Sequence, residues 1–543
     1  MQRSDIFTHL VIGAGTAGCV LAARIAENPG FRVLLIEAGP DCTSVKHAGG
    51  PRDIRRVPMK GQSKSFDPKI DWDVQIDLPE GGAMRVAQAK IVGGGSSING
   101  GTALRNTVED CREWIELGND AWAWEVVEPV YATLEDDEVQ GTTGRHPLVR
   151  TGLEEAGAIQ KAFVAGGKDC GLAWSDNLNA TGAEGLGASP VCRHGDRRVS
   201  IAETFIDPIR SRHNFQLLTD CVVDRILFSD RRAAGVLLAN HREIWASAEV
   251  IVSAGAIFSP ALLQRSGIGP RQLLSSLSIP AVQDLPVGAA LADHCCIPVT
   301  GRPRPGAFKE SDFSLQMQAR WSSELHPDAI DMQMVCFSYL YSAPTQSSPA
   351  PSDIAPHLQA QRSLGGTFSG HVAGIGCNVN KPTSVGDVRI RSRSPHDQPR
   401  VAPNYLTTST DRACAREAVR LAYRIVTTAA MQTVLSPPFG LTPAIISSDD
   451  LLNKWIQSQY CSTYHFTSTC RMAARDRGGV VDQNGRVYGI QGLRVADASI
   501  IPTIPAANTM WTTVMFADRI GRSVRDRSYI CDKRSIDKKR SYL

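Results

Sequence analysis

The sequence predicts an α/β protein in which one sheet domain is assembled from distant segments and a second domain is built from the residues between them. The chain has 543 residues, which allows more than one unit of about 150 residues. Its composition, 42% hydrophobic and 21% charged, is that of an ordinary folded protein. The third observation is a strand–helix–strand unit at the start of the chain.

This first unit combines a strand over Leu10 to Ile12, a helix over Ala17 to Glu27 and a second strand over Arg32 to Ile36. The alternation is typical of a βαβ unit. Similar apolar runs return at Val250–Val252 and Leu493–Ala496, each followed by Gly or Asp and a helical pattern. We therefore expect all these strands to share one sheet.

Charge and cysteine usage narrow the function classes. The net charge is +3 with a pI of about 8.2, which does not favour nucleic acid as a partner. No C-x-x-C pair occurs among the 14 Cys, so we expect mostly free thiols and no metal site. The chain has neither a signal-peptide pattern nor a long apolar run. We expect a cytoplasmic protein without a membrane span, and the final Ser541-Tyr542-Leu543 only weakly resembles a peroxisomal address.

Two segments lack periodicity. The stretch from Ser342 to Gly366 is rich in Pro and Ser and is expected to form a long loop. The end of the chain, CDKRSIDKKRSYL, is basic and polar, and we expect a tail over residues 523–543.

The strongest motif is VIGAGTAGCVLAARIAENPGFRVLLIEAG, which contains G-x-G-x-x-G as Gly13, Gly15 and Gly18. The first Gly permits a tight turn, the second lets a pyrophosphate approach the backbone, and the third lets the helix pack on the strand. Glu37 ends the second strand and can accept a hydrogen bond from a ribose hydroxyl. The motif predicts a dinucleotide site, and the acid at position 37 argues against NADP.

Two further glycine-rich segments are IVGGGSSINGGTALRN and SAGAIFSPALLQRSGIGP. Taken alone, the first is a flexible turn. The second is a strand–turn–helix unit in which Ser259-Pro260 opens a helix that stops at Gly267 and Gly269.

Together, in this order and spacing, the three segments resemble the glucose–methanol–choline oxidoreductase family of flavoproteins, most closely its aryl-alcohol oxidase, hydroxymethylfurfural oxidase and choline dehydrogenase types. The resemblance continues through LPVGAALADH and GRVYGIQGLRVADASIIPTIPAANT and weakens over residues 300–380. It implies a Rossmann-like FAD-binding domain from discontinuous segments and an α+β substrate-binding domain with an antiparallel sheet. The implied boundaries are 1–297 for the FAD region, 298–464 for the substrate domain and 465–522 for the C-terminal segment that completes the site.

The resemblance also implies non-covalent FAD, because Ile98 stands where some members carry the linking His. The pyrophosphate would lie at the helix that begins near Gly15, the adenosine ribose on Glu37, and the adenine against the backbone of Val223. The implied FAD-binding residues are Gly13, Gly15, Thr16, Ala17, Gly18, Glu37, Ala38, Gly93, Ser97, Asn99, Val223, Asp497, Ala498, Asn508 and Thr509.

The family's catalytic His comes from a stretch like H-x-x-G-T-x-x-M, which here begins at His465 and has Ser468 in place of the Gly. A neutral imidazole can take an alcohol proton while hydride leaves for the flavin. Among the 12 His we assign chemistry to His465 alone.

The second member of the family's pair, His or Asn, is placed by alignment at Met510, within NTMWTTVMFAD. A thioether neither donates nor accepts well, so the usual partner is expected to be missing. A shift that gives this role to Asn508 is possible, although the match through Val514-Met515 favours Met510. Trp511 replaces a usually small residue and suggests a remodelled pocket wall.

Three function classes stay open. One is an FAD-dependent oxidoreductase that acts on a hydroxyl group of a small aromatic or polycyclic molecule, with oxygen or another acceptor reoxidising the flavin. Another is a non-redox enzyme, such as a lyase, dehydratase or cyclase, that uses His465 for acid–base work. The third is a flavin-binding protein with little activity.

Overall fold

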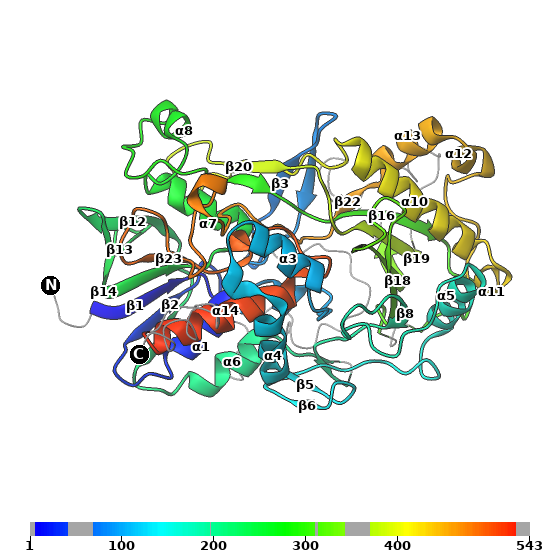
Figure 1. Cartoon of the computed structure of the whole chain (residues 1–543), viewed down its shortest axis with the longest axis horizontal. Helices are drawn as coiled ribbons and strands as arrows, with labels where there is room; N and C mark the ends of the chain where they lie inside the picture. The colour runs from blue at the N-terminus through cyan, green and yellow to red at the C-terminus, as the bar shows by residue number, and fades with distance from the viewer. Residues whose placement is uncertain (1–5, 42–68, 196, 310–312, 343–369, 528–543) are drawn as a thin grey trace, which may run out of the picture.

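Two sheets lie at opposite ends of the molecule in the computed structural model, and helices cover each of them (Figure 1). The structure describes residues 6–41, 69–195, 197–309, 313–342 and 370–527. The expected loop after Ser342 and most of the expected tail lie outside these residues.

The first sheet confirms that distant segments join. Its strand order is β11-β2-β1-β14-β13-β12, with β23 also paired to β14. Leu10 of β1 pairs in parallel with Val250, and Val250 pairs in parallel with Leu493. The strands are β1 (Ile6–Ile12), β2 (Val33–Ile36), β11 (Phe215–Leu218), β12 (Val223–Ser229), β13 (Arg232–Leu238), β14 (Glu243–Val252) and β23 (Leu493–Val495).

Helices α1 (Thr16–Ile25) and α14 (Thr509–Arg525) pack together against this sheet. An ion pair joins them, because Arg24 Nε lies 2.5 Å from the fully buried Asp518 Oδ1. Helix α14 ends at Arg525, so it runs three residues into the segment that we expected to be a tail.

The second sheet is antiparallel, in the order β22-β16-β19-β18-β17-β8. It also takes in β8, from the region that we expected to belong wholly to the FAD part. Its strands are β8 (Gly185–Ala188), β16 (Cys295–Gly301), β17 (Met317–Ser322), β18 (Ile330–Ser342), β19 (Gly370–Val379) and β22 (Cys461–Ser462).

The two faces of the second sheet differ in polarity because successive side chains point to opposite sides. Met332 and Met334 of β18 belong to the apolar cluster that includes α5 (Ala158–Asp169) and α10 (Ser409–Val426). Gln333, which lies between them in the strand, faces the other way. The helix-covered face is therefore the core, and the polar face looks toward the first sheet.

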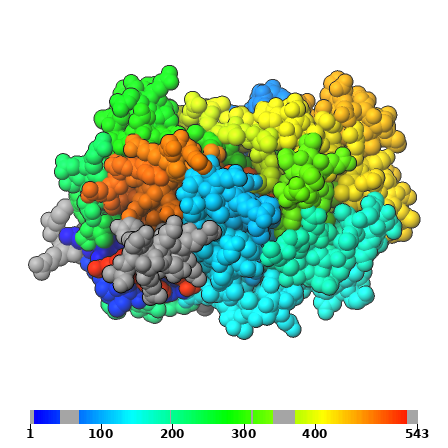
Figure 2. Space-filling view, in the orientation of Figure 1, coloured from blue at the N-terminus to red at the C-terminus, as the bar shows by residue number. Residues whose placement is uncertain are grey.

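The remaining elements surround these two layers. On the face shown in Figure 2, the blue and cyan region of α3 and α4 lies between the two halves of the molecule. The helices are α2 (Gly95–Ile98), α3 (Val108–Glu116), α4 (Trp124–Leu134), α6 (Ile201–Phe205), α7 (Gly255–Arg265), α8 (Arg271–Ser276), α11 (Ala429–Gln432), α12 (Pro443–Ser447) and α13 (Asp449–Gln459). Short strands are β3 (Val74–Asp77), β4 (Ala83–Val86), β5 (Glu135–Asp137), β6 (Thr142–Thr143), β7 (His146–Pro147), β9 (Arg193–His194), β10 (Arg197–Arg198), β15 (Ala289–Leu291), β20 (Gly386–Arg389) and β21 (Arg400–Ala402).

Helix α7 differs from its prediction. It begins at Gly255, and Pro260 lies inside it. Proline has no N–H and leaves the carbonyl four residues earlier without its helical donor. That carbonyl, of Ala256, accepts a 2.6 Å hydrogen bond from the hydroxyl of Thr469 instead. The C-terminal segment thus supplies the bond that allows the helix to start early.

Two global expectations can be compared with the described residues. No disulfide links the cysteines in this part of the chain. Within the same ranges, the structure has no helix with both the length and the apolar character needed to cross a bilayer.

Thr469→Val should lower the free energy of unfolding by about 1 to 3 kcal/mol, because it leaves the buried Ala256 carbonyl unpaired. Thr469→Ser keeps the hydroxyl and is the matched control. Chemical denaturation of both variants, compared with wild type, measures the difference. A loss in Thr469→Ser as large as the loss in Thr469→Val would contradict this account, because the Ser variant keeps the hydroxyl that makes the hydrogen bond.

Candidate functional site

The first glycine segment lets α1 sit directly on the turn after β1. Gly13 has a φ of +96°, and a Cβ there would lie 2.4 Å from the Ser253 carbonyl oxygen. A Cβ on Gly18 would lie 1.8 Å from the Gly13 carbonyl oxygen. Both positions therefore require Gly, as the motif predicts.

The N-terminus of α1 suits an anion. Its N-cap is Gly15, which provides no side-chain cap, and the first turn holds no acidic residue. The first backbone N–H groups of a helix have no partner within it, and the helix dipole favours negative charge there. A pyrophosphate fits this end of the helix.

The second glycine segment packs against the first. Gly93 N–H donates to the Ala14 carbonyl at 2.7 Å. Gly94 has a φ of +55°, and a Cβ there would lie 2.7 Å from Gly15 Cα. This segment is therefore no flexible turn, because it packs against the first glycine segment and continues into α2. Ser97 lies in α2, buried, and its hydroxyl donates to the Val92 carbonyl at 3.0 Å.

Glu37 lies at the end of β2, beside the same turn. Its carboxylate accepts from Ala14 N–H at 2.8 Å and from Gly39 N–H at 3.0 Å, and burial raises its pKa. Cys221 N–H donates to the Glu37 carbonyl at 2.9 Å, which brings the start of β12, where Val223 lies, to this end of the sheet. The expected ribose and adenine residues thus lie near one another.

Asp497 links the nucleotide sheet to the C-terminal segment. Its carboxylate accepts from Gly255 N–H at 2.8 Å and from the hydroxyls of Ser259 and Ser499, both at 2.5 Å. Burial raises its pKa. The neighbouring Ala498 carbonyl accepts from Ser468 N–H at 3.3 Å, so the loop that carries His465 rests on this segment.

His465 is held in a strained loop. Tyr464 and Ser468 have φ values of +65° and +71°, which explains why a Gly at position 468 suits the family's motif. His465 N–H donates to Asp293 at 2.7 Å. The Asp293 carboxylate also accepts from Ser462 Oγ at 2.6 Å and from the Tyr405 hydroxyl, and burial raises its pKa to about 6.

A second histidine, His294, contacts the first. The two Nδ1 atoms lie 2.9 Å apart, and Thr463 Oγ1 lies 3.0 Å from His465 Nδ1. The other ring nitrogen of His294 lies 3.0 Å from the Pro505 carbonyl oxygen. Burial lowers the pKa of His294 to about 3, although the Pro505 and Asn380 carbonyls favour the charged ring.

The residue beside His465 Nε2 is Asn508 and not Met510. Asn508 Nδ2 lies 3.4 Å from His465 Nε2. Met510 packs against the core of the first sheet. The expectation that no amide stands here does not match this geometry.

Trp511 also lies away from the site. Its side chain is fully buried, and its indole N–H donates to Glu135 at 2.6 Å. It packs inside the FAD part, and the expectation of a remodelled pocket wall does not match its place.

The polar face of the second sheet reaches the same Asn. Gln333 Nε2 donates to Asn508 Oδ1 at 3.2 Å and to Gln318 Oε1 at 2.8 Å. Asn378 Nδ2 donates to Gln333 Oε1 at 3.1 Å. Asn378 and Gln333 are direct partners in the ladder of β18 and β19.

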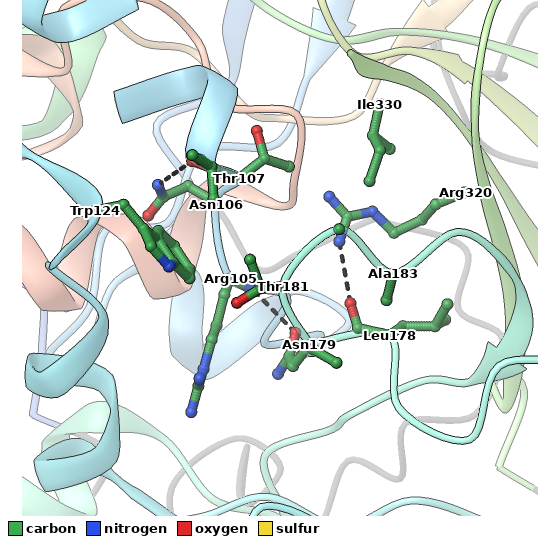
Figure 3. Close-up of a pocket in the computed structure, with 13 residues that line it drawn as sticks. Arg105, Asn106, Thr107, Trp124, Leu178, Asn179, Thr181, Ala183, Arg320 and Ile330 are labelled. Atoms are coloured by element: carbon green, nitrogen blue, oxygen red, sulfur yellow. Dashed lines mark hydrogen bonds between the residues drawn. The ribbon is translucent and has the colours of Figure 1, made fainter. Parts of the chain in front are cut away.

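A small, partly open pocket is lined by residues that include Arg105, Asn106, Asn179 and Arg320 (Figure 3). His465 and Asn508 are not among its lining residues. Arg320, in the lining of this pocket, also contacts the C-terminal segment. Its guanidinium donates to the carbonyls of Leu178 at 3.1 Å and Ala506 at 3.0 Å. This buried cation therefore ties the segment before Asn508 to the second sheet.

The sequence reasoning missed His294, Gln333 and Asn378. His294 ends the LPVGAALADH motif, and that position was a usable signal. Gln318 and Gln333 alternate with apolar residues in strand-like runs, which could have indicated a polar sheet face.

The described residues contain one group with metal-ligand spacing, namely His326, Asp331 and Cys414. Asp331 already accepts from Ser323 N–H and Oγ, each at 2.7 Å, and contacts His326 Nδ1 at 2.8 Å. These bonds explain the group as a stabilised turn.

Gly94→Ala should abolish FAD retention, because the new Cβ would collide with Gly15 Cα in the wall of the nucleotide site. A positive φ alone costs about 1 to 3 kcal/mol. Gly81→Ala is the control, because Gly81 has a φ of +91° with no atom within 4 Å of its Cβ position. The flavin-to-protein absorbance ratio after purification measures retention. Equal flavin contents in the two variants would refute the packing argument.

Comparisons with known proteins identify the family of the chain. The family model described as GMC oxidoreductase matches residues 7–296 and 382–517. The oxygen-dependent choline dehydrogenase of Vibrio vulnificus is 31% identical over 94% of this chain and 93% of its own length. The mitochondrial choline dehydrogenase of Mus musculus is 30% identical over 97% of this chain and 91% of its own length.

Solved structures share the fold. A pyridoxine 4-oxidase from Mesorbium loti superposes with a TM-score of 0.82 at 24% identity, covering 96% of this chain and 99% of that one. A fungal aryl-alcohol oxidase has a TM-score of 0.76 at 21% identity, covering 96% and 99%. The chain therefore belongs to the glucose–methanol–choline (GMC) oxidoreductase family and is an FAD-dependent oxidoreductase that acts on CH–OH groups.

Proposed function

We propose that this enzyme oxidises a small, uncharged aromatic or polycyclic alcohol, with His465 as the base that takes the hydroxyl proton. The observation that carries the proposal is the 3.4 Å contact between His465 Nε2 and Asn508 Nδ2. A proton acceptor and a hydrogen-bond donor then meet at one point, which is what a reacting hydroxyl group needs.

The cofactor and the protein have separate roles in the oxidation. Bound FAD supplies the acceptor for the hydride that leaves the carbinol carbon. The glycine segments and Glu37 hold the cofactor. His465 takes the hydroxyl proton at Nε2, and Asn508 donates an N–H to the oxygen as negative charge develops there.

The presence of Asn508 removes the reason to prefer a lyase-like or cyclase-like reaction. That alternative rested on a missing partner for His465, and an amide stands beside the ring. The electron acceptor is oxygen or another small molecule, since relatives named as oxidases and as dehydrogenases both occur.

The side chains of the second sheet support an uncharged substrate. On the face of Gln333, Val335 and Cys296 are half-buried apolar groups. The ladder partner of Val335 is Gly376, and the sulfur of Cys296 lies 3.1 Å from the place that a Cβ on Gly376 would take. Amides with apolar groups beside them favour a neutral aromatic alcohol over a cation such as choline.

His465→Ala should slow flavin reduction by about 10² to 10⁴, the usual value of a general base, while the flavin spectrum stays unchanged. The measurement is anaerobic stopped-flow reduction with benzyl alcohol, pyridoxine and choline as probes. We expect benzyl alcohol to reduce the wild-type flavin faster than choline does. Near-normal reduction in the variant would contradict the assignment.

Asn508→Leu should cost about two to four kcal/mol in the barrier to flavin reduction, by analogy with the loss of an oxyanion-hole donor. Its side chain does not cap α14, so the helix should survive. Met510→Leu is the matched control and should change the same rate little, because a thioether and an isobutyl group fill similar apolar space. The assignment of the pair fails if the Met510 variant is the slower one.

A further inference from the structure

A continuous chain of hydrogen bonds runs through His465, from the second sheet to the Pro505 carbonyl. Its members are Asn378, Gln333, Asn508, His465, His294 and the Pro505 carbonyl. The separations between bonded atoms are 3.1, 3.2, 3.4, 2.9 and 3.0 Å in that order. Side-chain amides and neutral imidazoles can each be turned either way, so the direction of such a chain needs an anchor.

The Pro505 carbonyl is that anchor, because a carbonyl oxygen can only accept. His294 Nε2 must therefore carry the proton in the 3.0 Å bond to it. His294 is fully buried, and burial lowers its pKa to about 3, so the ring is neutral at physiological pH. A neutral imidazole holds one proton, which leaves His294 Nδ1 as an acceptor.

This acceptor determines the state of His465. Because His294 Nδ1 has no proton, the 2.9 Å bond between the two Nδ1 atoms requires the proton on His465. Thr463 is consistent with this, since its hydroxyl donates to the His294 carbonyl at 3.0 Å and its oxygen can accept from His465 Nδ1. The lone pair of a neutral His465 then lies at Nε2.

The amide side chains on the Nε2 side of His465 are oriented in agreement with this tautomer. An unprotonated Nε2 requires the N–H₂ end of Asn508, which turns Asn508 Oδ1 toward Gln333. Gln333 Nε2 donates to that oxygen, and Gln333 Oε1 accepts from Asn378. Every link thus agrees with one direction, from the sheet to Pro505.

We propose that His294 is a positioning residue that holds His465 in the Nδ1–H tautomer, so that Nε2 is the proton acceptor in the oxidation, and that Gln333 orients Asn508 in the same way from the other side. The inference rests on the proposed function for the use of Nε2, and on the hydrogen-bond geometry and the burial of a neutral His294 for the tautomer. In the reaction, the alcohol proton passes to His465 Nε2 and the hydride passes to FAD. His294 stays neutral and continues to accept from Nδ1.

The tautomer can be observed without a substrate. The holoenzyme is labelled with histidine that carries ¹⁵N at Nδ1 only, and its solid-state ¹⁵N spectrum is compared with that of His465→Gln. The difference spectrum should show the His465 signal as a protonated, pyrrole-type nitrogen. An unprotonated, pyridine-type signal at neutral pH would overturn the proposal.

Variants test whether His294 is the residue that sets the tautomer of His465. Thr463→Val removes the weaker acceptor and serves as the common background. In it, His294→Asn keeps an acceptor near the place of the imidazole Nδ1, whereas His294→Leu removes it. We expect His294→Leu to slow flavin reduction by benzyl alcohol about 10- to 100-fold, the usual effect of losing the residue that orients a functional His, with little change in the alcohol concentration that gives the half-maximal rate. His294→Asn should restore most of the loss.

Equal rates in the Asn and Leu variants, with equal flavin contents, would contradict the positioning role. The outcomes also separate this inference from the proposed function. A pyridine-type Nδ1 signal together with an inactive His465→Ala enzyme refutes the tautomer and leaves the base assignment intact. A pyrrole-type signal together with a fully active His465→Ala enzyme refutes the base assignment and leaves the tautomer intact.

Discussion

The contact on which the site depends is the 2.9 Å hydrogen bond between His294 and His465. It joins the residue before β16 of the second sheet to the loop that returns the chain to the nucleotide sheet. Asp293, one residue earlier, holds the backbone of the same loop at 2.7 Å. His465 is therefore attached to the second sheet by its backbone and by its ring, while the segment beneath it rests on the nucleotide sheet.

The C-terminal segment positions the other residues around this contact. Asp497 holds its start against the turn after β14, and the Pro505 carbonyl accepts from His294 further on. Asn508 is the N-cap of α14, which packs on α1 of the nucleotide motif. Because one stretch of chain touches both domains, the separation between His465 and Asn508 follows from the packing of the two sheets.

Much of this arrangement could be predicted from the sequence, because glycines that only Gly can replace leave a strong pattern. Gly13, Gly18 and Gly94 are required by close contacts, and the motifs around them indicated the cofactor and the family. Asn508 was harder to identify, since the direction of its side chain depends on where α14 begins, and alignment alone favoured Met510. Gln333 and Asn378 lie where the resemblance weakens, and their role arises only when three strands pair. The end of the LPVGAALADH motif marks His294 as a candidate, but its contact with His465 follows only from the fold.

The central claim is that the enzyme removes hydride from a carbinol carbon while His465 takes the hydroxyl proton. The most direct test is anaerobic reduction of the bound flavin by benzyl alcohol that carries deuterium on the carbinol carbon, followed by stopped-flow absorbance and by analysis of the product. The account predicts slower flavin reduction than with the unlabelled alcohol, and formation of the aldehyde in step with loss of flavin colour. Consumption of the alcohol while the flavin stays oxidised would contradict it.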